Sequence, residues 1–158
     1  MQALSASGLR LLMNLWPPLL AAGVRVVRLD DDFRHAEVEL RMRPWNRNYV
    51  GAHFGGSLFA MTDPFWMIMV MRNLGREYRV WDRAAEISFD IPGRGVVRAC
   101  FALSEERLQG IRAKTADGDK HLTWFETDVV DEGGETVARV RKQLYVRRKQ
   151  AGDVAIRR

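Results

Sequence analysis

Hydrophobic and polar residues alternate in several stretches of the chain. The clearest stretch runs from His35 to Met42, where apolar side chains at every second position are separated by Glu37, Glu39 and Arg41. A period of two is typical of a strand with one buried face and one solvated face. The same reasoning predicts strands over residues 24–29, 78–91, 96–103, 122–130 and 136–148.

Other stretches have the pattern of a helix. Apolar residues recur at helical spacing over residues 5–16, and Pro17-Pro18 is expected to end that N-terminal helix. The longest apolar run, residues 57–71, predicts a buried central helix over about residues 56–73. It is too short, and too interrupted by Thr62 and Asp63, to cross a membrane.

The order of these elements predicts a single α+β domain over residues 1–158. A helix, two strands and the central helix come first, and four further strands follow, with a helical turn after Ser104. The absence of βαβ alternation favours an antiparallel sheet. To bury a long apolar helix, that sheet must curve around it. Residues 150–158 are expected to form a polar tail.

The loop before the central helix carries a motif. It reads N-x-x-G-x-x-F-G-G over residues 48–56, and Asp63 follows seven positions after Gly56. This resembles the N-x-x-G-x-x-H-G-G signature of hotdog-fold acyl-CoA thioesterases, including the phenylacetate-pathway type. The wider pattern, over residues 18–148, also resembles the hotdog family called domain of unknown function 4442. Phe54 stands where the signature has His, and His53 lies one place earlier.

The resemblance implies a hotdog fold and a site that hydrolyses acyl thioesters. Asp63 would act as general base for water, or directly as nucleophile. We prefer the general base, because an acid in an apolar site takes up a proton more readily. Backbone amides near Gly55 and Gly56 would polarise the thioester carbonyl, since glycine lets a ligand approach the backbone closely. The family also implies a homodimer or a dimer of dimers, with each site shared between two subunits.

The candidate residues divide into two groups. The catalytic candidates are Asp63, Gly56 and His53. The substrate-binding candidates are Asn48, Gly51, Phe54, Gly55, Ser57, Thr62 and Arg83. Simpler structural roles stay open for several of them. Asp63-Pro64 is a common pair at a helix start, and we expect the Thr62 hydroxyl to bond a neighbouring carbonyl in preference to positioning water. Arg83 could pair with Asp63 or with a ligand phosphate, and we expect it to form a solvated ion pair.

Three other functions remain open at this stage. One is a non-catalytic acyl-thioester-binding protein, which the missing signature His favours. Another is an enoyl-thioester hydratase or dehydratase, in which His53 and Asp63 would supply the required pair. The third is nucleic-acid binding, suggested by a formal net charge of +5. The sequence lacks a platform of interleaved aromatic and basic residues, so we expect no nucleic-acid partner.

Composition narrows the remaining possibilities. Cys100 is the only cysteine and the three histidines are far apart in the sequence, so neither a disulfide framework nor a metal site is expected. No cofactor is expected beyond coenzyme A as part of the substrate, or an acyl carrier in its place. The basic group near the C-terminus, residues 139–149, is interpreted as the solvated face of a strand. Without a signal-peptide pattern or a membrane span, we expect a cytoplasmic protein.

Overall fold

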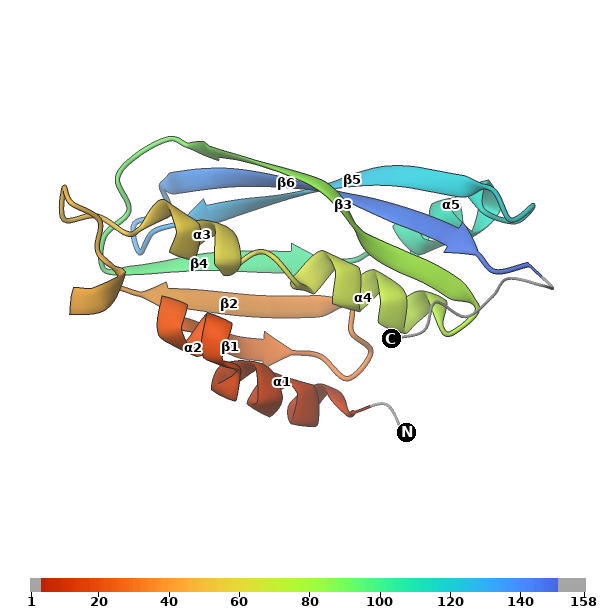
Figure 1. The fold of residues 1–158 in the computed structure, drawn as a ribbon, viewed down its shortest axis with the longest axis horizontal. Coiled ribbons are helices and arrows are strands. Elements are labelled where there is room, and N and C mark those ends of the chain that lie inside the picture. Colours follow the sequence, from red (N-terminus) through yellow and green to blue (C-terminus); the bar gives the residue numbers. More distant parts are fainter. Residues whose placement is uncertain (1–3, 151–158) are drawn as a thin grey trace.

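The computed structural model of the protein describes residues 4–150. Its strands form one antiparallel sheet in the order β1-β2-β4-β5-β6-β3. The six strands are β1 (Val24–Leu29), β2 (His35–Arg41), β3 (Tyr78–Phe89), β4 (Val96–Ala102), β5 (Lys120–Val130) and β6 (Thr136–Arg148). The helices lie mainly on one face and along one edge of this curved sheet (Figure 1).

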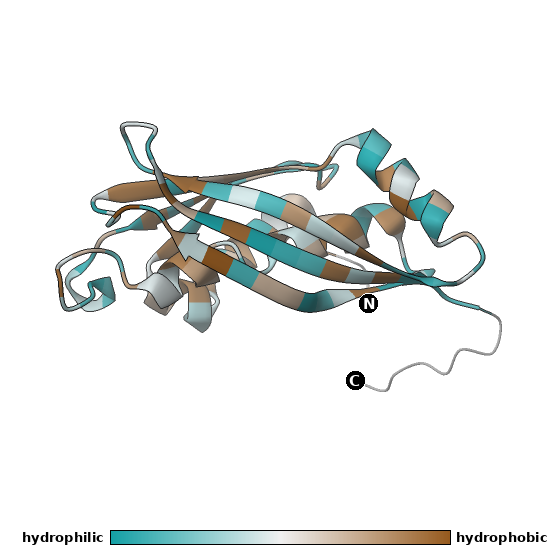
Figure 2. Ribbon diagram, turned by 90° about the horizontal axis from the view of Figure 1, so that it is seen from above, coloured by the Kyte–Doolittle hydropathy of each residue, from teal (hydrophilic) through white to brown (hydrophobic). Residues whose placement is uncertain are grey.

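The alternating sequence pattern produces the buried face of the sheet. In β2 the apolar residues Ala36, Val38 and Leu40 are buried. In β6 a buried residue occurs at nearly every second position, and the exposed positions carry arginine. Figure 2 shows the resulting bands of hydrophilic and hydrophobic residues along the strands. Side chains of the inward face reach the helices, which is how the sheet encloses an apolar core.

The strand order was not evident from the sequence. After the central helix the chain enters β3, which pairs with β6 and not with its sequence neighbour β4. Ile87 of β3 lies opposite Val140 of β6, with a bulge between Asp82 and Ala84. Because β3 is the last strand in the sheet, one of its sides has no strand partner among residues 4–150.

The helices surround this sheet in two groups. α3 and α4 cross its face, while α1 and α2 lie beside β1 at the opposite edge from β3 (Figure 1). α5 follows β4 and is largely hydrophilic (Figure 2). Their bounds are α1 (Ala6–Leu15), α2 (Pro17–Ala22), α3 (Gly55–Ala60), α4 (Phe65–Leu74) and α5 (Glu105–Lys114), with a 3₁₀ turn, η1 (Pro44–Asn46).

The expected central helix is divided into two segments. α3 ends at Ala60 and α4 begins at Phe65, with a turn between them. Pro64 has no amide hydrogen and therefore interrupts the ladder of helical bonds. The Thr62 hydroxyl also donates to the Phe59 carbonyl at 2.8 Å, which satisfies an acceptor at the end of α3. The break places Asp63 in a turn and not within a continuous helix.

The N-terminal helix is followed by a second helix that the sequence did not predict. Pro17 and Pro18 end α1, but Pro17 also occupies the first position of α2, where its missing amide costs nothing. The apolar side of α1 is only partly covered. Met13 is buried, whereas Leu11 and Leu15 are each 63% exposed. The N-terminal helices therefore present apolar side chains at the surface.

Aromatic side chains join α4 to the sheet. The Trp66 ring stacks on Phe125 of β5 at 4.7 Å between ring centres and meets the edge of Phe101 at 5.4 Å. Its indole N–H donates to the Thr127 hydroxyl at 2.8 Å, so the polar atom of this buried ring is satisfied. Within residues 4–150, no helix is long and apolar enough to span a membrane. Most of the expected polar tail, residues 151–158, lies outside the described part of the chain.

Candidate active site

Asp63 lies in the break between α3 and α4 and pairs with a buried lysine. The ammonium Nζ of Lys142 donates to Asp63 Oδ1 at 2.6 Å. The Asp63 side chain is 53% exposed, whereas that of Lys142 is 3% exposed. One carboxylate oxygen is therefore held from the interior while the group remains open to solvent. In the single chain, Asp63 is therefore not enclosed by apolar side chains, although its apolar sequence context had suggested that it would be.

A second carboxylate completes this charged cluster. Asp82, on β3, has its Oδ1 atom 3.5 Å from Lys142 Nζ. Burial raises the pKa of Asp82, and the nearby Asp63 carboxylate adds to that rise while Lys142 opposes it. The two carboxylates and one ammonium carry a formal net charge of −1. Lys142 is thus the only cation among the described ion-pair partners of Asp63 and Asp82.

Lys142 was missed by the sequence interpretation. We assigned it with its basic neighbours to a solvated strand face, and this is wrong for Lys142, which is 2% exposed. Its place in β6 contained the signal. Lys142 has the same parity as Val140 and Leu144, both of which are buried, whereas Arg141 has the opposite parity and is exposed. A lysine at an inward-facing strand position requires a partner for its buried charge, and the half-exposed Asp63 supplies one.

The loop before α3 is organised by Asn48. Its side-chain carbonyl accepts the amides of Val50 and Ala52, and its amide donates to the carbonyl of His53 at 3.2 Å. Gly51 lies at the tip with φ +76°, a conformation that favours glycine. Both residues shape the turn that leads the chain into α3. Their predicted contact with a substrate stays a prediction.

His53 is directed into the protein. It is 2% exposed, and its Nε2 atom lies 3.2 Å from the Gly95 carbonyl, while its own amide donates to the Gly93 carbonyl. Burial lowers the pKa of His53, and the bond to Gly95 partly opposes this. The geometry joins the motif loop to the turn after β3. It gives His53 a structural place, and its predicted catalytic role stays a prediction.

The glycine pair forms the start of α3. Helix geometry leaves the amides of Gly55 and Gly56 without an intrahelical acceptor. The Phe54 ring packs over Gly56 and the Phe89 ring over Gly55, so a side chain at either glycine would collide with an aromatic ring. Ser57 is buried in the first turn. The two glycines therefore permit close packing of the aromatic rings. Their predicted contact with a substrate stays a prediction.

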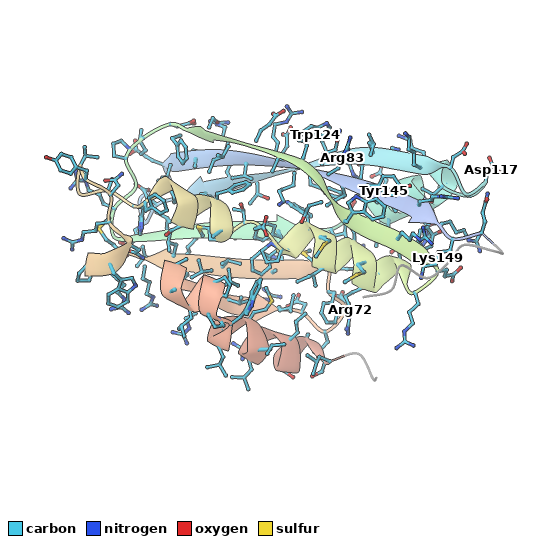
Figure 3. The ribbon with its side chains drawn as sticks, in the orientation of Figure 1. Arg72, Arg83, Asp117, Trp124, Tyr145 and Lys149 are labelled. Atoms are coloured by element: carbon cyan, nitrogen blue, oxygen red, sulfur yellow. The ribbon has the colours of Figure 1, made fainter. Side chains whose placement is uncertain are left out.

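Arg83 does not join the charged cluster. It lies at the bulge of β3 and is exposed (Figure 3). The described ion-pair partner of Asp63 is Lys142 and not Arg83. Asp82, the sequence neighbour of Arg83, lies within ion-pair distance of Lys142 instead. Asp63 also does not cap α4, because the N-cap position is Pro64 and no side chain bonds there. The alternative of a helix-capping role for Asp63 is therefore wrong.

An apolar hollow of about 230 Å³ adjoins Asp63. It lies between α2 and the split central helix. Trp16, Pro18 and Leu19 form one side, and Phe59, Ala60 and Pro64 form the other together with Asp63. A polar group at the rim of an apolar hollow is the usual composition of a small-molecule site.

The comparisons with known proteins agree with this architecture. The family model described as domain of unknown function (DUF4442) matches residues 6–146. The chain belongs to the DUF4442 family. No curated protein matches its sequence.

Solved structures show which fold this DUF4442 protein has. A Pseudomonas aeruginosa protein of unknown function, described as a probable thioesterase, has a TM-score of 0.82 and 19% identity over 94% of this chain and 99% of that chain. A thioesterase from Haemophilus influenzae has a TM-score of 0.67 and 13% identity over 97% of each chain. These matches establish the hotdog fold, as the motif predicted.

The charged cluster of this DUF4442 protein suits proton transfer more than metal binding. Within the described residues, no group of three His, Cys, Asp or Glu side chains is placed to hold a metal ion. Asp63 and Asp82 share an ammonium, which occupies the position between the two carboxylates. What the arrangement offers is a solvent-accessible carboxylate at the edge of an apolar hollow.

Proposed function

We propose that this DUF4442 protein hydrolyses an acyl thioester, with coenzyme A or an acyl carrier as the thiol. The observation that carries the proposal is the position of Asp63. Its carboxylate is held by the buried Lys142 ammonium at 2.6 Å, open to solvent, and adjacent to an apolar hollow. A carboxylate that can act as a base, beside a site for an apolar chain, suits thioester hydrolysis.

The reaction follows from that placement. A water molecule held by Asp63 attacks the thioester carbonyl carbon, and Asp63 accepts the proton that the water loses. The carbonyl oxygen becomes an oxyanion, which the backbone amides near Gly55 and Gly56 stabilise. Collapse of the tetrahedral intermediate breaks the carbon–sulfur bond, and the departing thiolate takes up the proton from Asp63, which restores the carboxylate. In the alternative route Asp63 attacks directly, and water then cleaves the resulting anhydride.

Lys142 supports either route. Both use the Asp63 carboxylate, and the Lys142 ammonium holds it in place through a charge-assisted hydrogen bond of 2.6 Å. Because Lys142 binds one carboxylate oxygen, the other is free to face the substrate. The similarity to solved structures that are described as thioesterases supports the same reaction class.

The alternative functions receive less support. A hydratase would need His53 beside Asp63, but His53 is buried and engaged with the Gly95 carbonyl. A non-catalytic acyl-binding protein remains the second candidate, since Phe54 replaces the signature His. It predicts that acyl thioesters bind and are not hydrolysed, whereas the first proposal predicts turnover.

The proposal includes a homodimer or a dimer of dimers in the cytoplasm. The edge strand β3 supports an assembly. It is 12 residues long, has a free side within residues 4–150, and exposes Trp81 and Phe89. Such an edge is a template for pairing with a second strand. Asp82 lies on β3, so pairing there would bring the second subunit close to the charged cluster.

Hydrolysis of a panel of acyl-CoAs, followed by release of the free thiol, tests the proposal. Asp63→Asn preserves the shape of the side chain and removes the base. We expect its kcat/KM to fall by about 10²-fold or more, as is typical for loss of a general base. Asp117→Asn is the matched control, because Asp117 lies in the turn after α5, far along the molecule from the α3–α4 break (Figure 3). No turnover of any thioester by the wild type, or equal turnover in Asp63→Asn, would refute the proposal.

A further inference from the structure

The hollow beside Asp63 has a composition that selects its ligand. Its walls are mainly apolar residues from the start of α2, from α3 and from the turn that follows α3, and among the described residues that line it Asp63 is the charged one. Phe59 on its wall also lies near the buried ammonium, since Lys142 Nζ is 5.5 Å from the centre of that ring. The ligand that fits has an apolar body and one polar group that meets the Asp63 carboxylate.

The charge of the cluster limits which polar group the ligand can carry. Asp63 and Asp82 outnumber Lys142, so the cluster repels a carboxylate head group. A free fatty acid would place its own carboxylate against Asp63. A thioester is neutral and presents only a carbonyl carbon and oxygen there. The rim of the hollow therefore favours an acyl thioester over the corresponding free acid.

The volume of the hollow limits the chain. A methylene group fills about the same space as one water molecule in the liquid, ~30 Å³. A hollow of about 230 Å³ thus accommodates a straight chain of roughly eight carbons. This is a medium-chain acyl group.

We propose that this hollow receives the acyl chain of the thioester, and that Trp16 limits the length of chain that fits. The inference rests on the proposed function, because it takes the thioester carbonyl to lie at Asp63. It adds the substrate class, medium straight chains, and a residue from the N-terminal helices that determines it. The central helix supplies the opposite wall through Phe59 and Ala60.

Trp16 is well placed to set the length without supporting the fold. It joins α1 to α2, and its side chain is substantially exposed. Its backbone makes the structural bonds: its amide donates to Met13, and its carbonyl accepts from Leu19 and Leu20. A Trp16→Ala variant keeps all three bonds and removes only the indole from the wall of the hollow.

Binding of non-hydrolysable acyl-CoA thioethers, with chains of two to fourteen carbons, tests this inference by calorimetry on the full chain. Each buried methylene is worth ~4-fold in Kd, so affinity should rise with length and level off near eight carbons. Trp16→Ala should move the levelling point to longer chains by two carbons or more. Ala60→Leu fills the hollow from the opposite wall and should move it to shorter chains.

Leu20→Ala is the control. Leu20 is exposed on the same short helix and does not line the hollow. A levelling point that is the same in wild type, Trp16→Ala and Leu20→Ala would overturn the inference. So would a medium-chain fatty acid that binds as tightly as the thioether. Unchanged thermal unfolding temperatures show that the variants are folded.

The two proposals fail separately. Hydrolysis by the wild type with a length dependence that ignores Trp16 and Ala60 would overturn the inference and leave the proposed function standing. Length-dependent binding that shifts in Trp16→Ala, without hydrolysis of any thioester, would support the acyl-chain site and refute the proposed hydrolysis.

Discussion

Removing Asp63 tests whether the charged cluster holds the fold together as well as the site. Asp63→Ala leaves the Lys142 ammonium buried, with Asp82 at 3.5 Å as its remaining described ion-pair partner. The Coulomb energy of the 2.6 Å pair is about 6 kcal/mol at an effective dielectric constant of 20, and about 1.6 kcal/mol in bulk water. Because Asp63 is half exposed, the net value lies toward the lower figure. We expect a loss of about 2 kcal/mol in the free energy of unfolding, the usual range for a hydrogen bond to a charged group.

A double-mutant cycle isolates that interaction. Lys142→Met keeps the aliphatic stem and removes the ammonium. In this background Asp63→Ala should cost less than about 0.5 kcal/mol, since its partner is already gone. The coupling energy between the two sites is then about 1.5–2 kcal/mol. Urea unfolding followed by circular dichroism, at one protein concentration for all variants, measures each term.

An exposed pair that includes the sequence neighbour of Lys142 on β6 provides the control. Arg141 of β6 bonds Glu86 of β3 at 3.0 Å, with both side chains about half exposed. Its cycle should give a coupling of about 0.5 kcal/mol or less, as is usual for surface ion pairs. If the Asp63–Lys142 coupling is no larger than that of Glu86–Arg141, our account of the buried ammonium is wrong.

Three further outcomes follow from the structure. Burial lowers the pKa of His53, so below the ordinary value of about 6.5 the unfolded chain binds more protons than the folded chain. The unfolding temperature should therefore fall from pH 7 to pH 5, and it should fall less steeply in His53→Gln. Equal slopes in the two proteins would contradict this. Asn46→Ala should lower the free energy of unfolding, measured with a chemical denaturant, by about 2–3 kcal/mol. The buried Asn46 side chain bonds the Arg43 amide and the carbonyls of Ala22 and Arg41. The control Trp45→Ala, at an exposed position, should change the free energy of unfolding little. Light scattering should give a mass of twice 18.1 kDa or a higher even multiple, and a purely monomeric protein would refute assembly through β3.

Local physics explains what was predictable from the sequence. Strand periodicity depends only on which side of the backbone each side chain leaves, so the alternation in residues 35–42 and 136–148 located β2 and β6. The motif over residues 48–56 likewise pointed to the hotdog fold and to the start of α3. The alternation along β6 also predicts that Lys142 faces inward, although its basic neighbours suggested an exposed strand face.

Contacts between distant segments required the tertiary structure. Asp63 and Lys142 are 79 positions apart, and they meet because β3 crosses to pair with β6 and the central helix breaks at Pro64. The turn at this break also lines the hollow, together with residues of α2. The sequence did not predict α2, because Pro17 and Pro18 were interpreted as the end of a helix and not as the start of one. Sequence patterns record the environment of each residue, apolar or polar. Which residue supplies that environment is decided only when the strands pair and the helices pack.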